Sequence, residues 1–414
     1  MSFLNNFYSI LNEYKFVILF YSILLFIIYL NRKKLKEEAP FIYLYRTKFG
    51  ITFMKKTSEK FRNIIKILGY IGIIFAYLGI IIVSVLLVKN AYEIIIQKPG
   101  AIGGSPVIPG LPIAGLGITF PLVIGWISLF IIMIVHEFSH GIVAKAHNVK
   151  IKNSGIAFFG PILGAFVEPD EKDLKKQPDE VQLSIFSAGP ISNVVLWIIC
   201  IIILIGLSNV VLSMTYSDGV KIGIIKNETL PAYSSGIKDN SIIIKINEYN
   251  IKNRTDLEFA LENLKPNQET NILIKEIDEN KKEIKKEYKI IPTIHPKNET
   301  KAYLGILILE EQRTLKNNNQ FNNIIYKILL WFYELFSWTS FISINIGLIN
   351  LFPIFITDGA QMLRKNFETL FKNNKEKGLL IWKNINLMGL IIIGILILYN
   401  PLRNLFNIII NIIF

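Results

Sequence analysis

The sequence has almost no cysteine and long stretches without any charge. Cys200 is the single cysteine among 414 residues, which excludes an internal disulfide framework and favours a small apolar core position for that residue. The first apolar run, residues 16–30, lacks the small-residue cleavage site of a secretory signal peptide. Charged residues make up 19% of the chain against 51% hydrophobic residues, and they lie between the apolar runs. This segregation is typical of a polytopic membrane protein.

The formal net charge is +13, and the basic residues gather at the ends of the apolar runs. In that position they indicate membrane topology rather than contacts with nucleic acid, since loops rich in lysine and arginine stay on the cytoplasmic side. We therefore expect the lipid bilayer as a partner, and no nucleic acid. The basic loop that ends near residue 63 predicts a cytoplasmic side and an N-terminus outside the cell membrane.

About six transmembrane helices are predicted by apolar runs of spanning length. They correspond to residues 16–30, 67–88, 118–140, 181–214, 323–351 and 379–398. The stretch 100–117 is rich in Gly and Pro and predicts an outer loop or a re-entrant segment. The C-terminal stretch 402–414 carries a narrow stripe of Asn, which predicts a helix lying at the outer interface rather than another span.

The chain changes character between the fourth and fifth predicted spans. Short β-rich runs alternate there with polar turns, and residues 255–264 look helical, which predicts a soluble α+β domain on the outer side. We therefore divide the chain into five parts: two N-terminal spans with their loops (1–117), a first core part (118–214), the inserted domain (215–312), a second core part (313–378), and a last span with an interfacial tail (379–414). The predicted fold class is a polytopic α-helical membrane protein with an inserted α+β domain.

The third predicted span ends in His136-Glu137-Phe138-Ser139-His140, an H-E-x-x-H motif. On a helix the two histidines lie one turn apart on the same face, so both imidazoles can bind one Zn²⁺ ion, with Glu137 beside it as the candidate base. Ionisable groups in an apolar helix are costly, so a functional site is the default interpretation. A chance pentapeptide, or a soluble zinc enzyme with a buried helix, remains an alternative.

A catalytic zinc site needs a third protein ligand at the same membrane depth. Asp358 meets that condition, because it follows the inward end of the fifth predicted span; its alternative role is an N-cap of the next helix. We expect His147 to be exposed, and His295 to lie across the membrane in the outer domain. Glu168 and Asp170 are expected to be surface charges.

Three further features flank these residues. Residues 154–167, punctuated by Gly and Pro, predict a β-hairpin, which is either an ordinary loop or an edge on which an extended substrate could pair. Gly189 favours helix packing, whereas Asn193 either bonds across helices or faces the active site. Asn350 is the first candidate to donate a hydrogen bond to a developing oxyanion and Asn193 the second; Asn350 could instead merely end its helix before Pro353.

These motifs resemble those of the site-2 protease family of intramembrane zinc metalloproteases. The similarity comprises the H-E-x-x-H, the Ala188-Gly189-Pro190 run with Asn193, and an N-x-x-P-x-x-x-x-D-G motif from Asn350 to Gly359. Residues 164–168 resemble the end of the family's membrane-associated hairpin. Within the inserted domain, Gly219 to Gly223, Pro231-Ala232 and Gly236 to Lys238 resemble a PDZ domain.

The resemblance implies a zinc metalloendopeptidase with His136, His140 and Asp358 as metal ligands and Glu137 as base. It also implies regulated intramembrane proteolysis of membrane-anchored protein substrates, with the PDZ-like domain excluding bulky ones. Two other classes stay open on the residues alone. A non-catalytic scaffold could bind peptides through the outer domain, but it would not need Glu137. A metal carrier would show ionisable positions along a path across the membrane, whereas here they gather at one end.

Overall fold

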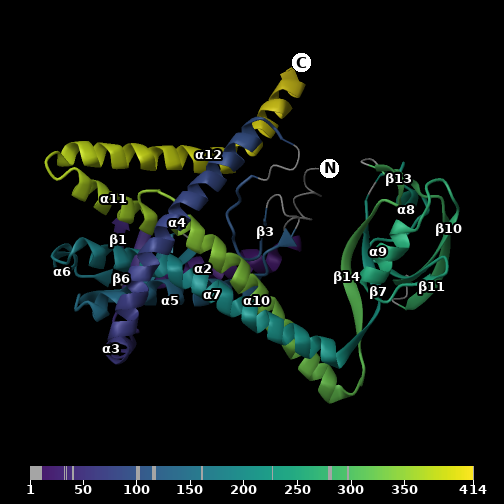
Figure 1. Ribbon diagram of the computed structural model, residues 1–414, viewed down its shortest axis with the longest axis horizontal. Helices are drawn as coiled ribbons and strands as arrows, with labels where there is room; N and C mark the ends of the chain where they lie inside the picture. Colours follow the sequence, from purple (N-terminus) through teal and green to yellow (C-terminus); the bar gives the residue numbers. More distant parts are fainter. Residues whose placement is uncertain are drawn as a thin grey trace. The chain divides into compact units, whose positions relative to one another are not determined.

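Two compact units make up the computed structural model of this chain, which describes residues 12–31, 33, 35–39, 42–98, 103–113, 118–159, 162–225, 227–277, 282–295 and 298–413. The first unit comprises Met1–Leu204 and Phe332–Phe414, and the second comprises Ile205–Trp331. Long helices dominate the first unit, whereas the second is mostly β-structure (Figure 1).

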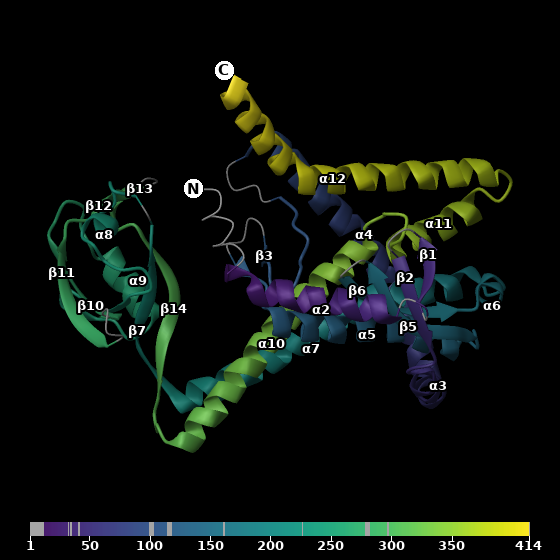
Figure 2. The same cartoon turned by 180° about the vertical axis from the view of Figure 1, so that it is seen from behind.

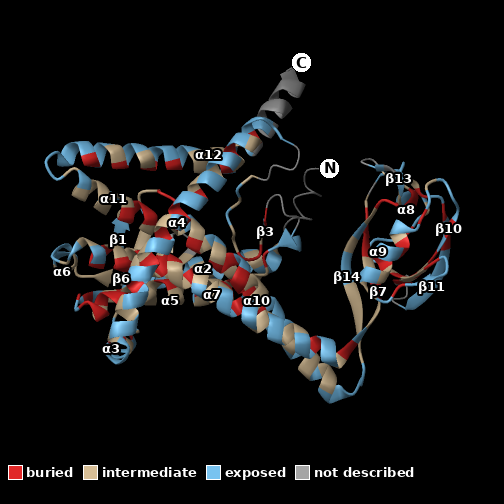
Figure 3. Ribbon diagram, viewed as in Figure 1, coloured by how far each residue is buried: buried red, intermediate tan, exposed pale blue. Residues whose placement is uncertain are grey.

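Four helices in the described part of the chain are long and apolar enough to cross a membrane. They are α4 (Arg62–Ile95), α5 (Leu122–Ala146), α7 (Asp179–Met214) and the stretch Lys375–Tyr399 of α12 (Lys375–Ile413). Many residues of these helices are exposed (Figure 3), and large apolar residues are among them. Apolar surface that is not covered by protein is expected where helices face lipid.

The first and fifth predicted spans fall outside this group of four. Helix α2 (Lys15–Asn31) is apolar but has only 17 residues. Helix α10 (Gln320–Leu351) is long, yet it carries buried hydroxyl groups at its helix contacts. Thr339 Oγ1 donates to Ser128 Oγ of α5 at 3.0 Å, and Ser343 Oγ donates to a backbone carbonyl of α7 at 2.8 Å. Polar groups of this kind hold helices together within a bundle.

The last predicted span and the predicted C-terminal helix are parts of one helix. Helix α12 is continuous from Lys375 to Ile413, with Pro401 inside it. A proline within a helix removes one backbone hydrogen bond and bends the helix, and α12 is visibly bent (Figure 1). Of the predicted outer loop, residues 100–102 and 114–117 lie outside the described residues, and the remainder contains β3 (Pro112–Ile113), which pairs with β4 (Ile118–Thr119).

A four-stranded antiparallel sheet lies beside α5, in the order β1-β2-β5-β6. Its strands are β1 (Lys36–Ala39), β2 (Ile42–Thr47), β5 (Ile151–Phe159) and β6 (Ile162–Pro169). The β5–β6 pair confirms the hairpin predicted at residues 154–167, although its turn, Gly160-Pro161, lies outside the described residues. The β1–β2 pair extends this hairpin from a segment more than a hundred residues earlier (Figure 2).

Three shorter helices flank the long helices of the first unit. They are α3 (Ile51–Lys60), α6 (Glu171–Lys175) and α11 (Asp358–Leu370). Helix α3 packs on α5, and α11 packs on α12. Asp170 caps α6 by accepting from the backbone N–H groups of Lys172 and Asp173, a common arrangement at a helix start.

The second unit is a sheet in the order β11-β10-β8-β7-β14, to which β9 adds through β8. Its elements are β7 (Thr215–Ile224), α8 (Pro231–Ser234), β8 (Ile242–Ile246), β9 (Tyr249–Asn250), α9 (Arg254–Glu262), β10 (Thr270–Ile277), β11 (Glu283–Ile290), β12 (Thr293–His295), β13 (Asn298–Tyr303) and β14 (Ile306–Leu315). Alternate strand residues such as Val220, Ile222, Ile272 and Ile274 are buried and form one core. Strands and a helix were predicted in this region, and both are present.

Candidate metal centre

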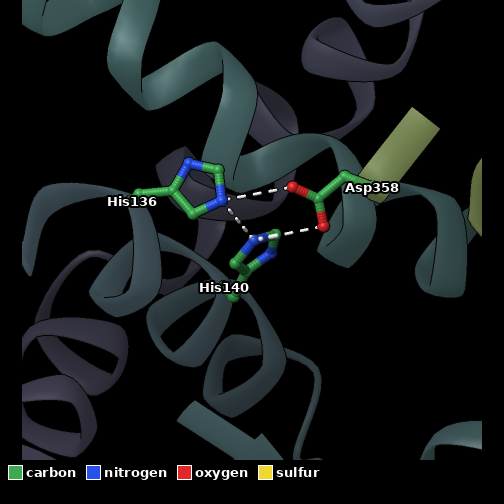
Figure 4. A group of neighbouring side chains, drawn as sticks. All are labelled: His136, His140 and Asp358. Atoms are coloured by element: carbon green, nitrogen blue, oxygen red, sulfur yellow. Dashed lines mark hydrogen bonds and ion pairs between the residues drawn. The ribbon is translucent and has the colours of Figure 1, made fainter. Parts of the chain in front are cut away.

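His136 and His140 lie one turn apart on α5, and Asp358 lies at the start of α11. Their side chains point toward one another (Figure 4). The two Nε2 atoms are 3.3 Å apart, and the Asp358 carboxylate oxygens lie 3.2 Å from His136 Nε2 and 3.4 Å from His140 Nε2. One ligand atom from each residue falls within 4.8 Å of the others. Two segments more than two hundred residues apart in the sequence therefore meet at one point, as the motifs predicted.

This donor set fits zinc. Two imidazole nitrogens and one carboxylate oxygen are ligands that catalytic zinc sites use, with a fourth position left for water or substrate. Gly189 of α7 leaves space beside the two imidazoles because it has no side chain. A Cβ at Gly189 would overlap His140 Nε2 and lie 2.5 Å from His136 Nε2. Packing was the role predicted for Gly189; the surface it packs against is the pair of imidazoles itself.

Both imidazoles are oriented through their other ring nitrogen. His140 Nδ1 lies 2.7 Å from the carbonyl oxygen of Ile185 and can donate to it. His136 Nδ1 lies 3.1 Å from the amide nitrogen of Asn193, whose side chain is fully buried. A proton on each Nδ1 leaves each Nε2 free to bind a metal, which is the usual arrangement of ligating histidines. Because Nδ1–H is a donor, the Asn193 amide must be turned over so that its oxygen accepts; that oxygen is buried and has no other partner among the described residues.

The hydrogen bond between Asn193 and His136 Nδ1 predicts a measurable effect on metal binding. We expect Asn193→Ala to raise the Kd for zinc about 10- to 100-fold, because His136 loses the partner that fixes its ring and tautomer. Competition with a chromophoric chelator measures that Kd in the detergent-solubilised chain. Asn345→Ala is the matched control, since this exposed amide bonds only to a carbonyl of its own helix. Equal zinc affinity in the two variants would contradict the orienting role.

Asp358 is brought to the histidines by the loop that links α10 to α11. Thr357, not Asp358, caps α11, since its Oγ1 accepts from the N–H of Ala360; the alternative of Asp358 as N-cap is therefore wrong. A Cβ at Gly359 would overlap the carbonyl of Leu351, so glycine lets α11 begin against the end of α10. Lys365 of α11 pairs with Asp179 of α7 at 2.9 Å and holds the two helices together.

Glu137 is fixed on the other side of the site by a strand. Its Oε2 accepts from the backbone N–H of Val167 on β6 at 2.9 Å. Glu137, Asp358 and both histidines line one cavity of about 690 Å³ together with Asn350 and the exposed Ile356. Among the described residues Asn193 is not part of that lining. The arrangement therefore places Asn350 at the cavity and Asn193 behind a histidine.

The other candidate ligands lie elsewhere. His147 was predicted to be exposed, and this is wrong: it is buried just beyond α5, edge-on to Tyr70. Burial, with Lys66 and Arg62 nearby, holds the pKa of His147 below its usual range. His147 directly follows the apolar helix α5 and packs with it. Its polar neighbours in the sequence were therefore a poor guide to its burial. His295 lies on β12 in the second unit, against the ring of Tyr303.

Glu168 and Asp170 are not part of the group of ligand atoms, although Glu168 lines the same cavity. Glu168 is partly buried and accepts from Arg46 Nε at 3.3 Å and from Asn153 Nδ2 at 3.2 Å. It is therefore part of an ion pair rather than a free surface charge. Sequence reasoning missed this pair, as it missed the contact between Val167 and Glu137. The only available signal was that Val167 and Glu168 end the predicted hairpin that follows the H-E-x-x-H.

Comparison with known proteins agrees with the geometry of the site. A sequence profile described as peptidase family M50 matches residues 124–393. An uncharacterised protein of Methanocaldococcus jannaschii is 30% identical over 375 residues, which cover 87% of this chain and 88% of that protein. Proteins provisionally named zinc metalloproteases are also similar. One from Staphylococcus aureus is 22% identical over 65% of this chain and 71% of its own length, and one from Clostridium acetobutylicum is 24% identical over 58% and 85%.

Proposed function

This chain belongs to peptidase family M50, and from that premise we propose that it is an intramembrane zinc metalloprotease that hydrolyses peptide bonds in or near the membrane segments of membrane-anchored proteins. One observation carries the proposal. The ligand atoms of His136, His140 and Asp358 lie within 4.8 Å of one another, and Glu137 lines the same cavity. Four helices among the described residues are long and apolar enough to cross a membrane, so this chemistry would take place in or at the bilayer.

Each residue of the site would have its own role in the reaction. His136, His140 and Asp358 would hold zinc, which supplies a Lewis acid for a water molecule and a peptide carbonyl. Glu137 would accept a proton from the water as its oxygen attacks the carbonyl carbon, and return that proton to the amine nitrogen as the C–N bond breaks. Asn350, which lines the cavity, would donate a hydrogen bond to the developing oxyanion.

The edge of β6 supports a place for the substrate chain. A transmembrane helix cannot be cut until it unwinds, because its carbonyls are bonded within the helix. Strand β6 is the outer strand of its sheet, and its Val167 N–H faces Glu137 rather than β5. N–H groups alternate in direction along a strand, so the N–H of Ala165 faces the same edge. An extended substrate segment would pair there, next to the metal ligands.

The remaining assignments belong to the same proposal. Helices α2 and α10 would complete six spans in the cell membrane, with the metal ligands toward the cytoplasmic side and the second unit outside, in agreement with the basic loops. The second unit would be a PDZ-like domain. Its strand β14 is the outer strand of the sheet and packs against α9, which is the arrangement that a peptide joining a sheet edge requires.

Removal and return of zinc test the proposal. The full chain is placed in liposomes with a single-span protein whose outer part has been shortened, and cleavage is followed by mass spectrometry. We expect a zinc chelator to reduce cleavage to background, and an excess of Zn²⁺ but not Mg²⁺ to restore it, because imidazole ligands favour zinc and Mg²⁺ prefers oxygen. Cleavage that continues at its full rate in the zinc-free chain would rule out the proposed chemistry.

A further inference from the structure

A short segment before α4 contacts both elements that hold Glu137. This segment, residues 46–54, joins β2 to the first turn of α3. It lies well before the region that matches the family profile, which begins at residue 124. It also lies in a part of the sequence where only a basic cytoplasmic loop was predicted. We refer to it as the N-terminal clamp.

The clamp packs on the helix that carries the H-E-x-x-H. The ring of Phe138, the residue after Glu137, lies 6.3 Å from the ring of Phe49 and 6.1 Å from that of Phe53. Gly50 lies between them with φ of 73°, and a Cβ there would overlap the Phe138 ring. Glycine is needed at this position for two reasons: the positive φ and the close approach of the Phe138 ring.

The same contact continues one turn further along α5. Met54 is fully buried, and a Cβ at Gly141, the residue after His140, would overlap its sulfur atom. The clamp therefore contacts α5 at the residues that follow Glu137 and His140. Tight contacts of this kind fix the rotation of a helix about its axis, because packed side chains do not give way continuously.

The clamp also bonds to the strands beside the site. Ser154 Oγ of β5 donates to the carbonyl of Phe49 at 2.5 Å, and Thr47 Oγ1 donates to the carbonyl of Ser154 at 3.1 Å. Arg46 reaches across β5 to Glu168 of β6, with Nε donating to Oε2 at 3.3 Å. Glu168 directly follows Val167, whose N–H bonds to Glu137. The clamp thus contacts the residue that follows each partner of that hydrogen bond, Phe138 after Glu137 and Glu168 after Val167.

We propose that the N-terminal clamp positions Glu137 for proton transfer, with Gly50 and Arg46 as positioning residues, by fixing α5 relative to β6. The proposal rests on the proposed function. Gly50 is not part of the cavity lining, and Arg46 lines the cavity without an ion pair or hydrogen bond to a metal ligand among the described residues. Loss of either residue should therefore leave zinc binding intact. It should instead reduce the fraction of time that the Glu137 carboxylate is aligned, and misplacement by about 1 Å at a reacting group is enough to lower kcat strongly.

The test uses Gly50→Ala in the full chain in liposomes. We expect kcat to fall at least about 10-fold, with KM changed less than about 2-fold and zinc content unchanged. A readout that needs no activity is the amide exchange of the peptide covering residues 162–169, which should become faster as the Val167 bond opens more often. Gly236→Ala is the matched control, since Gly236 has φ of 76° but open space around its Cβ. It introduces the backbone strain without the collision.

Two further variants keep the test decisive. Gly50→Ala combined with Phe138→Leu removes the ring atoms that collide but also the ring contacts with Phe49 and Phe53, so it should recover part of the lost kcat. Arg46→Gln should also speed exchange in residues 162–169, and Arg46→Lys should restore part of the protection; these two variants apply if Gly50→Ala does not fold.

The clamp would have no positioning role if zinc-loaded Gly50→Ala, or Arg46→Gln in its place, kept both its kcat and its exchange rate. A double variant no better than Gly50→Ala would overturn the proposal as well. Failure of the proposed function gives a different result. The zinc-loaded parent chain would then cut no membrane-anchored protein, while the exchange measurement would still report whether the clamp holds β6 to α5.

Discussion

Glu137→Gln is expected to lower kcat by at least about 1,000-fold while the chain keeps its zinc. A glutamine has nearly the same shape and can still accept from the Val167 N–H, so the site should keep its geometry. It cannot take a proton from water or return one to the leaving amine, and a positioned general base contributes about 10²- to 10⁴-fold to a rate. Reporter cleavage in liposomes, with zinc measured in the same samples, gives both quantities.

The control for this variant is Glu334→Gln. Glu334 is an exposed carboxylate on α10 that does not line the cavity of the described structure, so its replacement should leave cleavage unchanged. The comparison also separates the three classes that the sequence left open. A scaffold or a metal carrier would not depend on Glu137, whereas a protease would. A Glu137→Gln protein that binds zinc and cuts as fast as the parent would exclude the protease.

Gly189→Ala is expected to have the second large effect, through the metal itself. Its new methyl group would overlap one imidazole nitrogen and lie 2.5 Å from the other. The helix or the histidines would have to move, and both lie in a tightly packed bundle. Loss of a residue that hydrogen-bonds to a zinc ligand lowers zinc affinity about 10- to 100-fold. A methyl group that collides with the ligands themselves should have a larger effect, of at least about 100-fold.

Gly206→Ala is the matched control, because Gly206 lies on the same helix and its Cβ would meet nothing within 4 Å. Both variants add the same methyl group to α7 and gain similar helix propensity. Zinc affinity by chelator competition and cleavage of the reporter should therefore fall in Gly189→Ala alone. Comparable zinc binding in both variants would mean that the metal does not lie between these imidazoles.

The proximity of the three candidate ligands could be predicted because a short sequence pattern identifies each of them. His136 and His140 are one turn apart on any helix, and Asp358 follows an apolar run whose direction the basic loops predict. Membrane depth then leaves few places where the segments can meet. The structure brings them together, and their role as zinc ligands stays a prediction that the experiments above address.

The surroundings of the site were not predictable in the same way. Strand β2, which carries Arg46, pairs with β5 more than a hundred residues later, and pairing between distant segments leaves no local pattern in the sequence. The partner of Arg46 and the contact of Gly50 with Phe138 depend on that pairing. Residue spacing alone would not have found them, because a glycine needed for close approach resembles a glycine in any turn.

Asn193 shows the same limit within the core. A polar residue in an apolar helix indicates a partner, but the sequence does not say on which side of the ligands that partner lies. The structure places its amide 3.1 Å from His136 Nδ1. This contact favours an orienting role over donation to an oxyanion, and it leaves Asn350 as the candidate that lines the cavity.

X-ray absorption at the zinc edge, on the full chain in lipid, tests the central claim most directly. We predict one zinc per chain with two imidazole nitrogens at about 2.0–2.1 Å and a carboxylate oxygen at about 2.0–2.2 Å. In Asp358→Ala the carboxylate contribution should disappear and the affinity for zinc should fall. A parent chain without zinc bound to imidazole, or an unchanged spectrum in Asp358→Ala, would contradict the account.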